Sequence, residues 1–415
     1  MTFDIVKYGQ FLIGPSSQVV RGFVSIYIVN QHLGLTAVGV WAQVLACHAF
    51  MYLFINFNLT QSMSRYYPRF LNESINVFRV SNTVFLVNLG FIVLYFIILF
   101  PFKNSVLNFV YGSDALKGFY LLAFLFIVEN LYNVIYCHYR SVLKSEKQAL
   151  LALSRLSFEM LFFFPFVHIF DAWYTLDIYT FLFLYIAFVF SSVVIAVVYL
   201  RETRNIFTAG FLIVSDWWQF VGYGLRLLPM SLSFWLISQP DRWFVAGKFD
   251  HETLGFYFIA TRFFMAYAFL VSPFHAIYTY IASETDQGLE GFYKVIRVAV
   301  FIALTFSFIL YLGHPFLLLL FKLEPAAYLS VANLVPYMLI SGFLYAFYAV
   351  LNTFRSINNP GQVSIEWLIL GVIYLSALSI FPSYFGLKGL VFAQIFSYSV
   401  VLIFVLIRLR TNERH

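Results

Sequence analysis

The stretch YGLRLLPMS, residues 223–231, lies in a long apolar run and yet contains an arginine and a proline. Residues 8–17, YGQFLIGPSS, begin with the same Tyr-Gly pair and also reach Pro and Ser after a short apolar run. Tyr8 and Tyr223 are 215 positions apart, and a second pair of similar phrases places Gly39 and Gly255 216 positions apart. Two matches at nearly one offset predict that the chain is an internal repeat of two similar halves.

The composition decides the class of protein. Of 415 residues, 62% are hydrophobic and 11% are charged, and the mean hydropathy is +0.84. Soluble domains carry roughly 25% charged residues, and a soluble fold of this composition would expose large apolar patches. We therefore expect an all-α polytopic membrane protein. Cys47 and Cys137 lie in apolar segments, so packing is their expected role, and the sequence indicates neither a metal site nor a cofactor.

Membrane-spanning helices need about 20 largely apolar residues each. Twelve segments meet this condition: 8–30, 37–64, 82–102, 116–139, 148–169, 176–200, 217–239, 253–280, 293–314, 328–352, 363–383 and 388–408. We predict a six-helix half at 1–200, an interfacial linker at 201–216 and a second six-helix half at 217–415. Because each half has an even number of spans, the repeat is expected to be parallel.

The positions of lysine and arginine predict the orientation. With the N-terminus in the cytoplasm, 15 of the 25 basic residues fall on the cytoplasmic side, 6 on the outer side and 4 within spans. Both termini are therefore expected to be cytoplasmic. The net charge of +6 then reflects topology and does not indicate a nucleic-acid partner.

Three stretches resemble the polysaccharide-unit (O-antigen) flippases of the MOP superfamily, the multidrug/oligosaccharidyl-lipid/polysaccharide exporters. The longest, residues 223–263, includes the Asp241-Arg242 pair and a Leu-Gly-aromatic-Tyr helix start; the others are 58–70 and 8–17. The resemblance implies two six-helix bundles around a central cavity. It implies a flippase in the bacterial inner membrane that moves an undecaprenyl-diphosphate-linked oligosaccharide to the periplasmic leaflet, for O-antigen or other surface polysaccharide. Besides that substrate and membrane lipids, a polysaccharide polymerase and a chain-length regulator would be its partners.

Six charged residues fall well inside predicted spans, where each costs about 2.5–3.5 kcal/mol and usually faces a cavity. They are four arginines and two glutamates: Arg21, Arg155, Arg226, Arg262, Glu129 and Glu159. The surplus of positive charge favours an anionic ligand, and one arginine guanidinium can donate two parallel hydrogen bonds to phosphate oxygens. We predict that Arg21, Arg226 and Arg262 contact the diphosphate. The alternative is that each pairs with a glutamate and only holds helices together.

Other polar residues have predicted roles. Arg155 and Glu159 are four residues apart, which predicts an ion pair on one helix face. Glu129 has no partner on its own helix, so Glu129 and Glu159 are the candidates for ion coupling. A polar face formed by Asn58, Gln61 and Arg65, together with Ser62, is expected to line the cavity. Pro15 and Pro229 predict matching kinks in the first and seventh spans.

Two other functions stay open at this stage. A MATE-like small-molecule antiporter would share the spans and the repeat, although an exporter of cations would favour an acidic cavity. A membrane polymerase or glycosyltransferase acting on lipid-linked sugars would need a long or carboxylate-bearing outer loop. The predicted outer loops are short, but they contain carboxylates: Asp171, Asp177, Asp241, Asp250 and Glu252. We expect a transporter and not an enzyme; a purely structural protein would leave the arginines within the spans unexplained.

Overall fold

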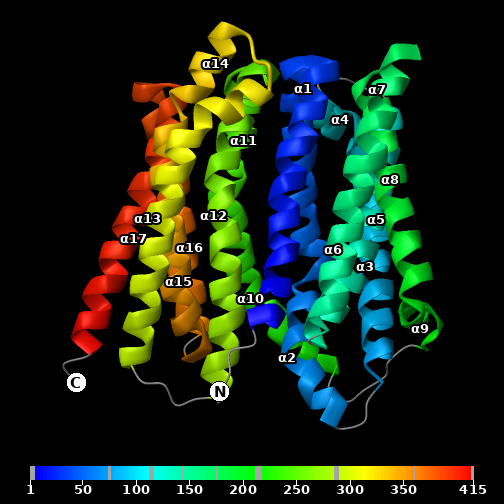
Figure 1. Cartoon of the computed structure of the whole chain (residues 1–415), viewed down its shortest axis with the longest axis vertical. Helices are drawn as coiled ribbons and strands as arrows, with labels where there is room; N and C mark the ends of the chain where they lie inside the picture. The colour runs from blue at the N-terminus through cyan, green and yellow to red at the C-terminus, as the bar shows by residue number, and fades with distance from the viewer. Residues whose placement is uncertain are drawn as a thin grey trace. The chain divides into compact units, whose positions relative to one another are not determined.

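The computed structural model describes residues 5–72, 76–111, 116–142, 144–173, 176–210, 217–284, 289–358 and 360–412. Within these ranges every regular element is a helix, and ten helical segments are long and apolar enough to cross a membrane (Figure 1). A helix satisfies its own backbone hydrogen bonds, which hydrocarbon requires of a spanning segment. The predicted all-α polytopic membrane fold is confirmed.

The chain divides into two compact units, Met1–Leu228 and Pro229–His415. The first unit contains α1 (Ile5–Asn56), α2 (Leu59–Asn72), α3 (Val77–Leu99), α4 (Lys103–Tyr111), α5 (Leu116–Ser141), α6 (Ser145–Phe158), the π-helix η2 (Glu159–Phe163), α7 (Phe164–Trp173), α8 (Ile178–Tyr199), α9 (Arg204–Thr208) and the start of α10 (Trp217–Ser238). The second unit contains the rest of α10, α11 (Pro240–Lys248), α12 (His251–Glu284), α13 (Leu289–Leu320), α14 (Pro325–Ala332), α15 (Val335–Asn358), α16 (Pro360–Phe385) and α17 (Leu387–Asn412).

The helix α1 contains the first two predicted spans. Its apolar part is 41 residues long, about 60 Å at 1.5 Å per residue, which is twice the hydrocarbon thickness of about 30 Å. Gly34 interrupts it with φ 79° and ψ 177°, a backbone conformation that glycine adopts without a Cβ clash. The helix therefore makes two passes. The predicted eighth span, 253–280, corresponds to α12, so all twelve predicted spans have a helical counterpart.

The predicted end of the second span at residue 64 is wrong. Phe57 and Asn58 take left-handed φ values of 44° and 56°, so the span ends at Asn56 and α2 begins at Leu59. The helix α2 is amphipathic: Met63, Tyr67 and Phe70 are buried, whereas polar residues lie on its exposed side. An amphipathic helix of this kind covers a bundle and does not cross the bilayer as a continuous apolar segment.

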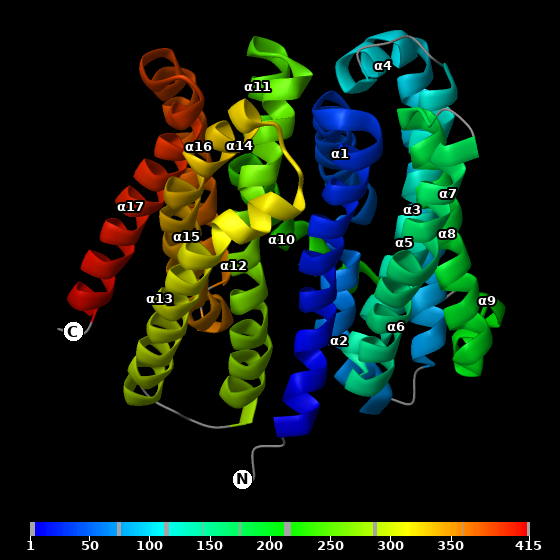
Figure 2. The ribbon, with the colours of Figure 1, turned by 45° about the horizontal axis from the view of Figure 1, so that its top comes forward.

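Each unit carries one short helix between its third and fourth long helical passes. In the first unit this is α4, which packs on α5, and in the second it is α14, which packs on α12 (Figure 2). The recurrence agrees with the predicted repeat. The units divide within α10, after Leu228. The division into 1–200, 201–216 and 217–415 stays a prediction, and residues 211–216 of the linker lie outside the described residues.

The described part of the linker is anchored to the first unit. Ile206 of α9 is fully buried among Tyr132, Tyr139 and Leu151. Next to it, Lys144 and Lys147 donate hydrogen bonds to Glu202 at 3.2 and 2.5 Å. Burial raises the pKa of Glu202, but the hydrogen bonds from the two lysines outweigh it and keep this pKa below its usual value. These contacts join the start of α6 to the 3-10 turn Arg201–Thr203 that follows α8.

Candidate functional site

A buried ionic network occupies the interior of the first unit, with Arg155 of α6 at its centre. Arg155 is 1% exposed. Its Nε donates to Glu159 Oε1 at 3.0 Å, which confirms the predicted ion pair at i,i+4. Its two Nη atoms donate to the two carboxylate oxygens of Glu129 on α5, one of them at 3.0 Å, and its guanidinium lies 4.3 Å from the ring centre of Tyr132. Glu129 is thus paired with an arginine of a neighbouring helix.

Arg21 of α1 completes the network. Its Nε donates to Glu159 Oε2 at 2.7 Å, and its Nη2 donates to the Tyr185 hydroxyl on α8 at 3.3 Å. Tyr185 also accepts from Arg155 at 3.3 Å. Two arginines and two glutamates therefore balance in charge and join four helical segments of the unit. This is the pairing arrangement that the sequence left open for Arg21, and its contact with a substrate stays a prediction.

A π-helix positions Glu159 between the two arginines. The N–H of Phe164 bonds to the Glu159 carbonyl five residues back. The next residue, Pro165, has no N–H and its ring excludes the carbonyl four residues earlier, which accounts for the wider turn. Glu159 can then present Oε2 to Arg21 and Oε1 to Arg155. Pro165 was the sequence signal for this bulge.

The stretch YGLR meets the start of α2 in the first unit. Asn58 Nδ2 donates to the Gly224 carbonyl at 3.5 Å, and a Cβ on Gly224 would lie 2.5 Å from the Phe57 carbonyl oxygen. The Arg65 guanidinium lies over the Tyr223 ring, 4.4 Å from its centre. Glycine is thus required because α10 approaches the backbone of the turn before α2. Two stretches that the sequence analysis singled out separately are neighbours in space.

The predicted polar face of α2 is divided by this geometry. Asn58 is buried and lies outside the helix in the left-handed turn, whereas Gln61 and Arg65 are exposed on α2. Arg226 is also exposed, three residues after Tyr223, so the two share a helix face. Within the described ranges, neither Arg65 nor Arg226 forms an ion pair. An exposed pair of guanidinium groups around Tyr223 remains available to an anion.

In the second unit, two arginines stack on one aromatic ring. The Arg262 guanidinium lies 4.1 Å from the centre of the Phe258 ring, and that of Arg242 lies 4.7 Å from the same centre. Both distances fall in the cation–π range. Arg242 is 3% exposed, and Arg262 is half-buried.

The prediction that Asp241 and Arg242 lie in an outer loop is wrong. Only Gln239 interrupts the helical run between α10 and α11, and the apolar segment Phe220–Lys248 extends through both. Asp241 is 1% exposed and accepts hydrogen bonds from the Tyr257 hydroxyl, from Gln394 Nε2 at 3.3 Å and from the Arg242 backbone N–H at 2.9 Å. The sequence analysis ended the span too early because it took the charged pair as a boundary.

A further buried ion pair joins α15 and α16. Arg355 Nη2 donates to Glu366 Oε1 at 2.6 Å, and the two residues are 8% and 2% exposed. Arg355 is one of the 15 basic residues that the predicted topology places on the cytoplasmic side, and Glu366 was not among the charged residues predicted to lie well inside spans. Glu366 lies six residues into an apolar helix of 26 residues, and this position was the sequence signal for a buried carboxylate.

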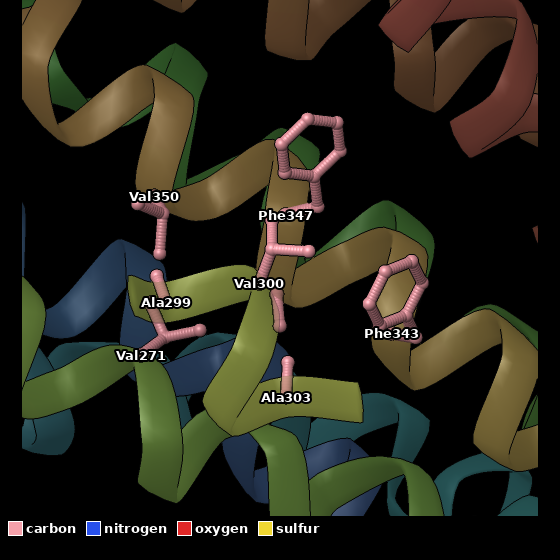
Figure 3. A pocket seen from close by; sticks show the side chains of 8 residues that line it. Val271, Ala299, Val300, Ala303, Phe343, Phe347 and Val350 are labelled. Atoms are coloured by element: carbon pink, nitrogen blue, oxygen red, sulfur yellow. The ribbon is translucent and has the colours of Figure 1, made fainter. Parts of the chain in front are cut away.

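The described residues contain no group of three or more His, Cys, Asp or Glu side chains that could hold a metal ion. A small pocket between α12, α13 and α15 of the second unit is lined by alanine, valine and phenylalanine side chains (Figure 3). Its lining contains no charged side chain, so this pocket is not the candidate site for an anionic group.

Known proteins were compared with the chain at the levels of sequence and structure. Neither a scan against protein-family models nor a search of curated proteins finds a match. Among solved structures, an inward-facing multidrug resistance MATE family transporter of the MOP superfamily gives a TM-score of 0.73 at 13% identity, covering 98% of this chain and 99% of the other.

Two further structures are similar over nearly the whole chain. The lipid II flippase MurJ in an inward closed conformation gives a TM-score of 0.72 at 13% identity, covering 96% of this chain and 87% of the other. An outward-facing multidrug resistance MATE family transporter of the MOP superfamily gives a TM-score of 0.68 at 17% identity, covering 99% of this chain and 95% of the other. At these identities the likeness concerns architecture. The chain is a multi-pass membrane protein with the fold of the MOP superfamily transporters.

Proposed function

We propose that this protein is a flippase that moves an undecaprenyl-diphosphate-linked oligosaccharide from the cytoplasmic to the periplasmic leaflet of a bacterial inner membrane. The observation that carries the proposal is the exposed pair Arg65 and Arg226 around Tyr223, which has no ion pair within the described residues. Guanidinium groups bind phosphate oxygens through paired charge-assisted hydrogen bonds. The fold, which a lipid II flippase also has, supports the same proposal.

In this proposal, the substrate contacts are Arg21, Arg226 and Arg262, and the polar lining is Asn58, Gln61 and Arg65. The sugars occupy the polar path, and the isoprenoid tail stays in lipid because it never needs to leave hydrocarbon. Both termini are cytoplasmic, and transport proceeds by alternating access of the two halves. A polysaccharide polymerase and a chain-length regulator receive the product.

Ion coupling belongs to Glu159, with Glu129 as the second candidate. Glu159 holds Arg21 at 2.7 Å, so protonation of this carboxylate would remove the charge that binds Arg21. Arg21 would then be released to a diphosphate. Glu129 is held by two hydrogen bonds from Arg155, which favours a structural contribution from that pair.

The test of substrate contact is surface-glycan export. Arg226→Ala and Arg262→Ala are introduced into a strain that depends on this protein, and Arg297→Ala, at an exposed arginine of α13, is the control. We expect the first two variants to abolish glycan export at normal protein abundance. Lysine at either position should restore export only partly, because a lysine ammonium cannot donate the two parallel hydrogen bonds of a planar guanidinium. Normal export by both alanine variants would contradict the proposal.

The test of coupling uses the purified protein in vesicles. Glu159→Gln mimics the protonated carboxyl, so we expect transport to continue at a rate that no longer depends on the proton gradient. Glu146→Gln, at an exposed glutamate in the first turn of α6, is the control. Glu129→Gln should weaken transport if Glu129 carries the proton instead. An unchanged gradient dependence in both variants would remove these glutamates from coupling.

A MATE-like antiporter is the second candidate because MATE transporters share the fold. In the described chain, however, the carboxylates of Glu129, Glu159 and Glu366 all hold arginine side chains, and the buried Asp241 carboxylate accepts hydrogen bonds from Tyr257 and Gln394. A cationic drug would have to displace those arginines. The geometry favours an anionic substrate.

A further inference from the structure

Arg242 is a buried charge whose guanidinium has no hydrogen-bond acceptor among the residues that the structure describes. The residue is 3% exposed, and its Nε is buried without a partner. Its guanidinium makes no hydrogen bond or ion pair with another described residue. Buried charges in proteins are normally paired and hydrogen-bonded, since burial removes their hydration. Such a guanidinium is a binding group that lacks its ligand.

The neighbouring carboxylate does not fill this role. Asp241 accepts from the Tyr257 hydroxyl, from Gln394 Nε2 and from the backbone N–H of Arg242. These donors come from α11, α12 and α17, and the Asp241 carboxylate accepts no hydrogen bond from the Arg242 guanidinium. The Arg242 guanidinium carbon lies over the Phe258 ring, 4.7 Å from its centre, and this contact uses none of its N–H groups as a donor to an oxygen acceptor.

A second guanidinium lies on the same ring. Arg262 and Arg242 lie 4.1 and 4.7 Å from the centre of Phe258, so their guanidinium carbons are separated by at most the sum of these distances, 8.8 Å. Arg262 follows the start of α12 by eleven residues, about 16 Å along the helix. Arg242 is on α11, which ends three residues before α12 begins. The two arginines thus mark a deep and a shallow position around one aromatic ring.

We propose that Arg242 and Arg262 form a two-position site for a phosphate or diphosphate group in the second unit, with Arg242 as the position nearer the α11–α12 junction. The identification of the ligand as a lipid-linked diphosphate rests on the proposed function; the recognition chemistry is shared by free pyrophosphate. An oxyanion supplies the acceptor that Arg242 lacks, and the Phe258 ring orients both guanidinium groups toward it.

The first experiment separates a binding role from a structural one. The thermal unfolding of the full chain in detergent is measured for the native protein and for Arg242→Gln, without and with polyprenyl diphosphate. Without ligand, the variant should have an equal or higher Tm, because it removes a buried charge that has no acceptor. With ligand, the native protein should gain Tm and the variant should not. A variant that is less stable without ligand and equally stabilised by it would overturn the site.

The second experiment measures affinity in nanodiscs and does not depend on transport. The probes are inorganic pyrophosphate, polyprenyl diphosphate and polyprenyl alcohol. Arg242→Gln should weaken diphosphate binding about 10- to 100-fold, the loss typical of a charge-assisted hydrogen bond, and Arg242→Lys should fall between. Arg297→Gln, at an exposed arginine of the same unit, should bind as the native protein does.

The probes also distinguish the source of the ligand. Binding of both diphosphates supports recognition of the phosphates alone, and binding of only the polyprenyl form supports a lipid headgroup site. Equal affinity of Arg242→Gln and the native protein for the diphosphates would overturn the proposal, as would native protein that binds neither of them. Because glycan export is not the readout, a failure here differs from a failure of the proposed flippase function.

Discussion

At the scale of single residues, Arg155 is the central cation that neutralises the glutamates in the interior of the first unit. It is 1% exposed and binds Glu129 and Glu159 together, so each charge of the network that it forms with these glutamates and Arg21 has a partner of opposite sign. Replacing such an ion pair as a whole can cost little, whereas removing one member leaves the others buried and unpaired. The network is therefore sensitive to single changes and tolerant of paired ones.

We predict that Arg155→Met destabilises the protein by about 3–5 kcal/mol, because two buried carboxylates lose their common partner. Adding Glu129→Gln to this variant should restore much of the loss, since the charges that remain, Arg21 and Glu159, pair with each other. Thermal unfolding in detergent measures both effects, with Arg297→Met at an exposed position as the control. Equal stability of the single and double variants would show that the charges are not coupled.

At the scale of helices, two glycines decide where elements bend and meet. Gly34 has a positive φ and turns one long apolar helix into two passes. Gly224 has ordinary helical geometry, and its importance comes from proximity: the Phe57 carbonyl would be 2.5 Å from an added Cβ. Gly34 is needed because the backbone has a positive φ there, and Gly224 is needed because α10 packs closely on the turn before α2.

Gly224→Ala should destabilise the first unit by about 1–3 kcal/mol, the usual cost of overpacking, because the contacting atom belongs to the backbone and cannot rotate away. Gly222→Ala, two residues earlier in α10, is the matched control, since nothing lies within 4 Å of its added Cβ. That control should be neutral or slightly stabilising. Thermal unfolding compares the two variants. Equal effects would mean that the close approach of α10 to α2 contributes nothing to stability.

At the scale of the whole molecule, the distribution of basic residues predicts a topology that is directly testable. In a chain whose Cys47 and Cys137 are replaced, single cysteines are placed at Ser113, which lies outside the described residues, and at Ser145, the first residue of α6. Only the cysteine at 113 should react with an impermeant thiol reagent applied from outside, because both termini are predicted to be cytoplasmic. Labelling at 145 alone would reverse the orientation.

The sequence alone was sufficient to predict the all-α membrane fold and the helical counterparts of twelve spans. It also predicted the Arg155–Glu159 pair, because composition, apolar segment length and an i,i+4 spacing are local properties. It also predicted a break between the first two spans, at residues 31–36, but not that Gly34 makes this break with a positive φ, because an apolar run gives no sign of that backbone conformation. It also ended the seventh span before Asp241, since a charged pair in sequence does not show whether distant residues will satisfy it.

Only the tertiary structure decided which charges are partners. The partner of Glu129 is 26 residues away and that of Arg21 is 138 residues away, so no spacing rule connects them. The partners of Asp241 come from residues 257 and 394, whereas Arg242 beside it has no acceptor among the described residues. The sequence placed Arg21, Glu129 and Arg155 inside apolar spans, whereas it placed Asp241 and Arg242 in an outer loop, and only the fold buries that pair. Helix packing determined which of them are neutralised, because pairing inside a membrane requires contact within a few ångströms, and contact is a property of the fold.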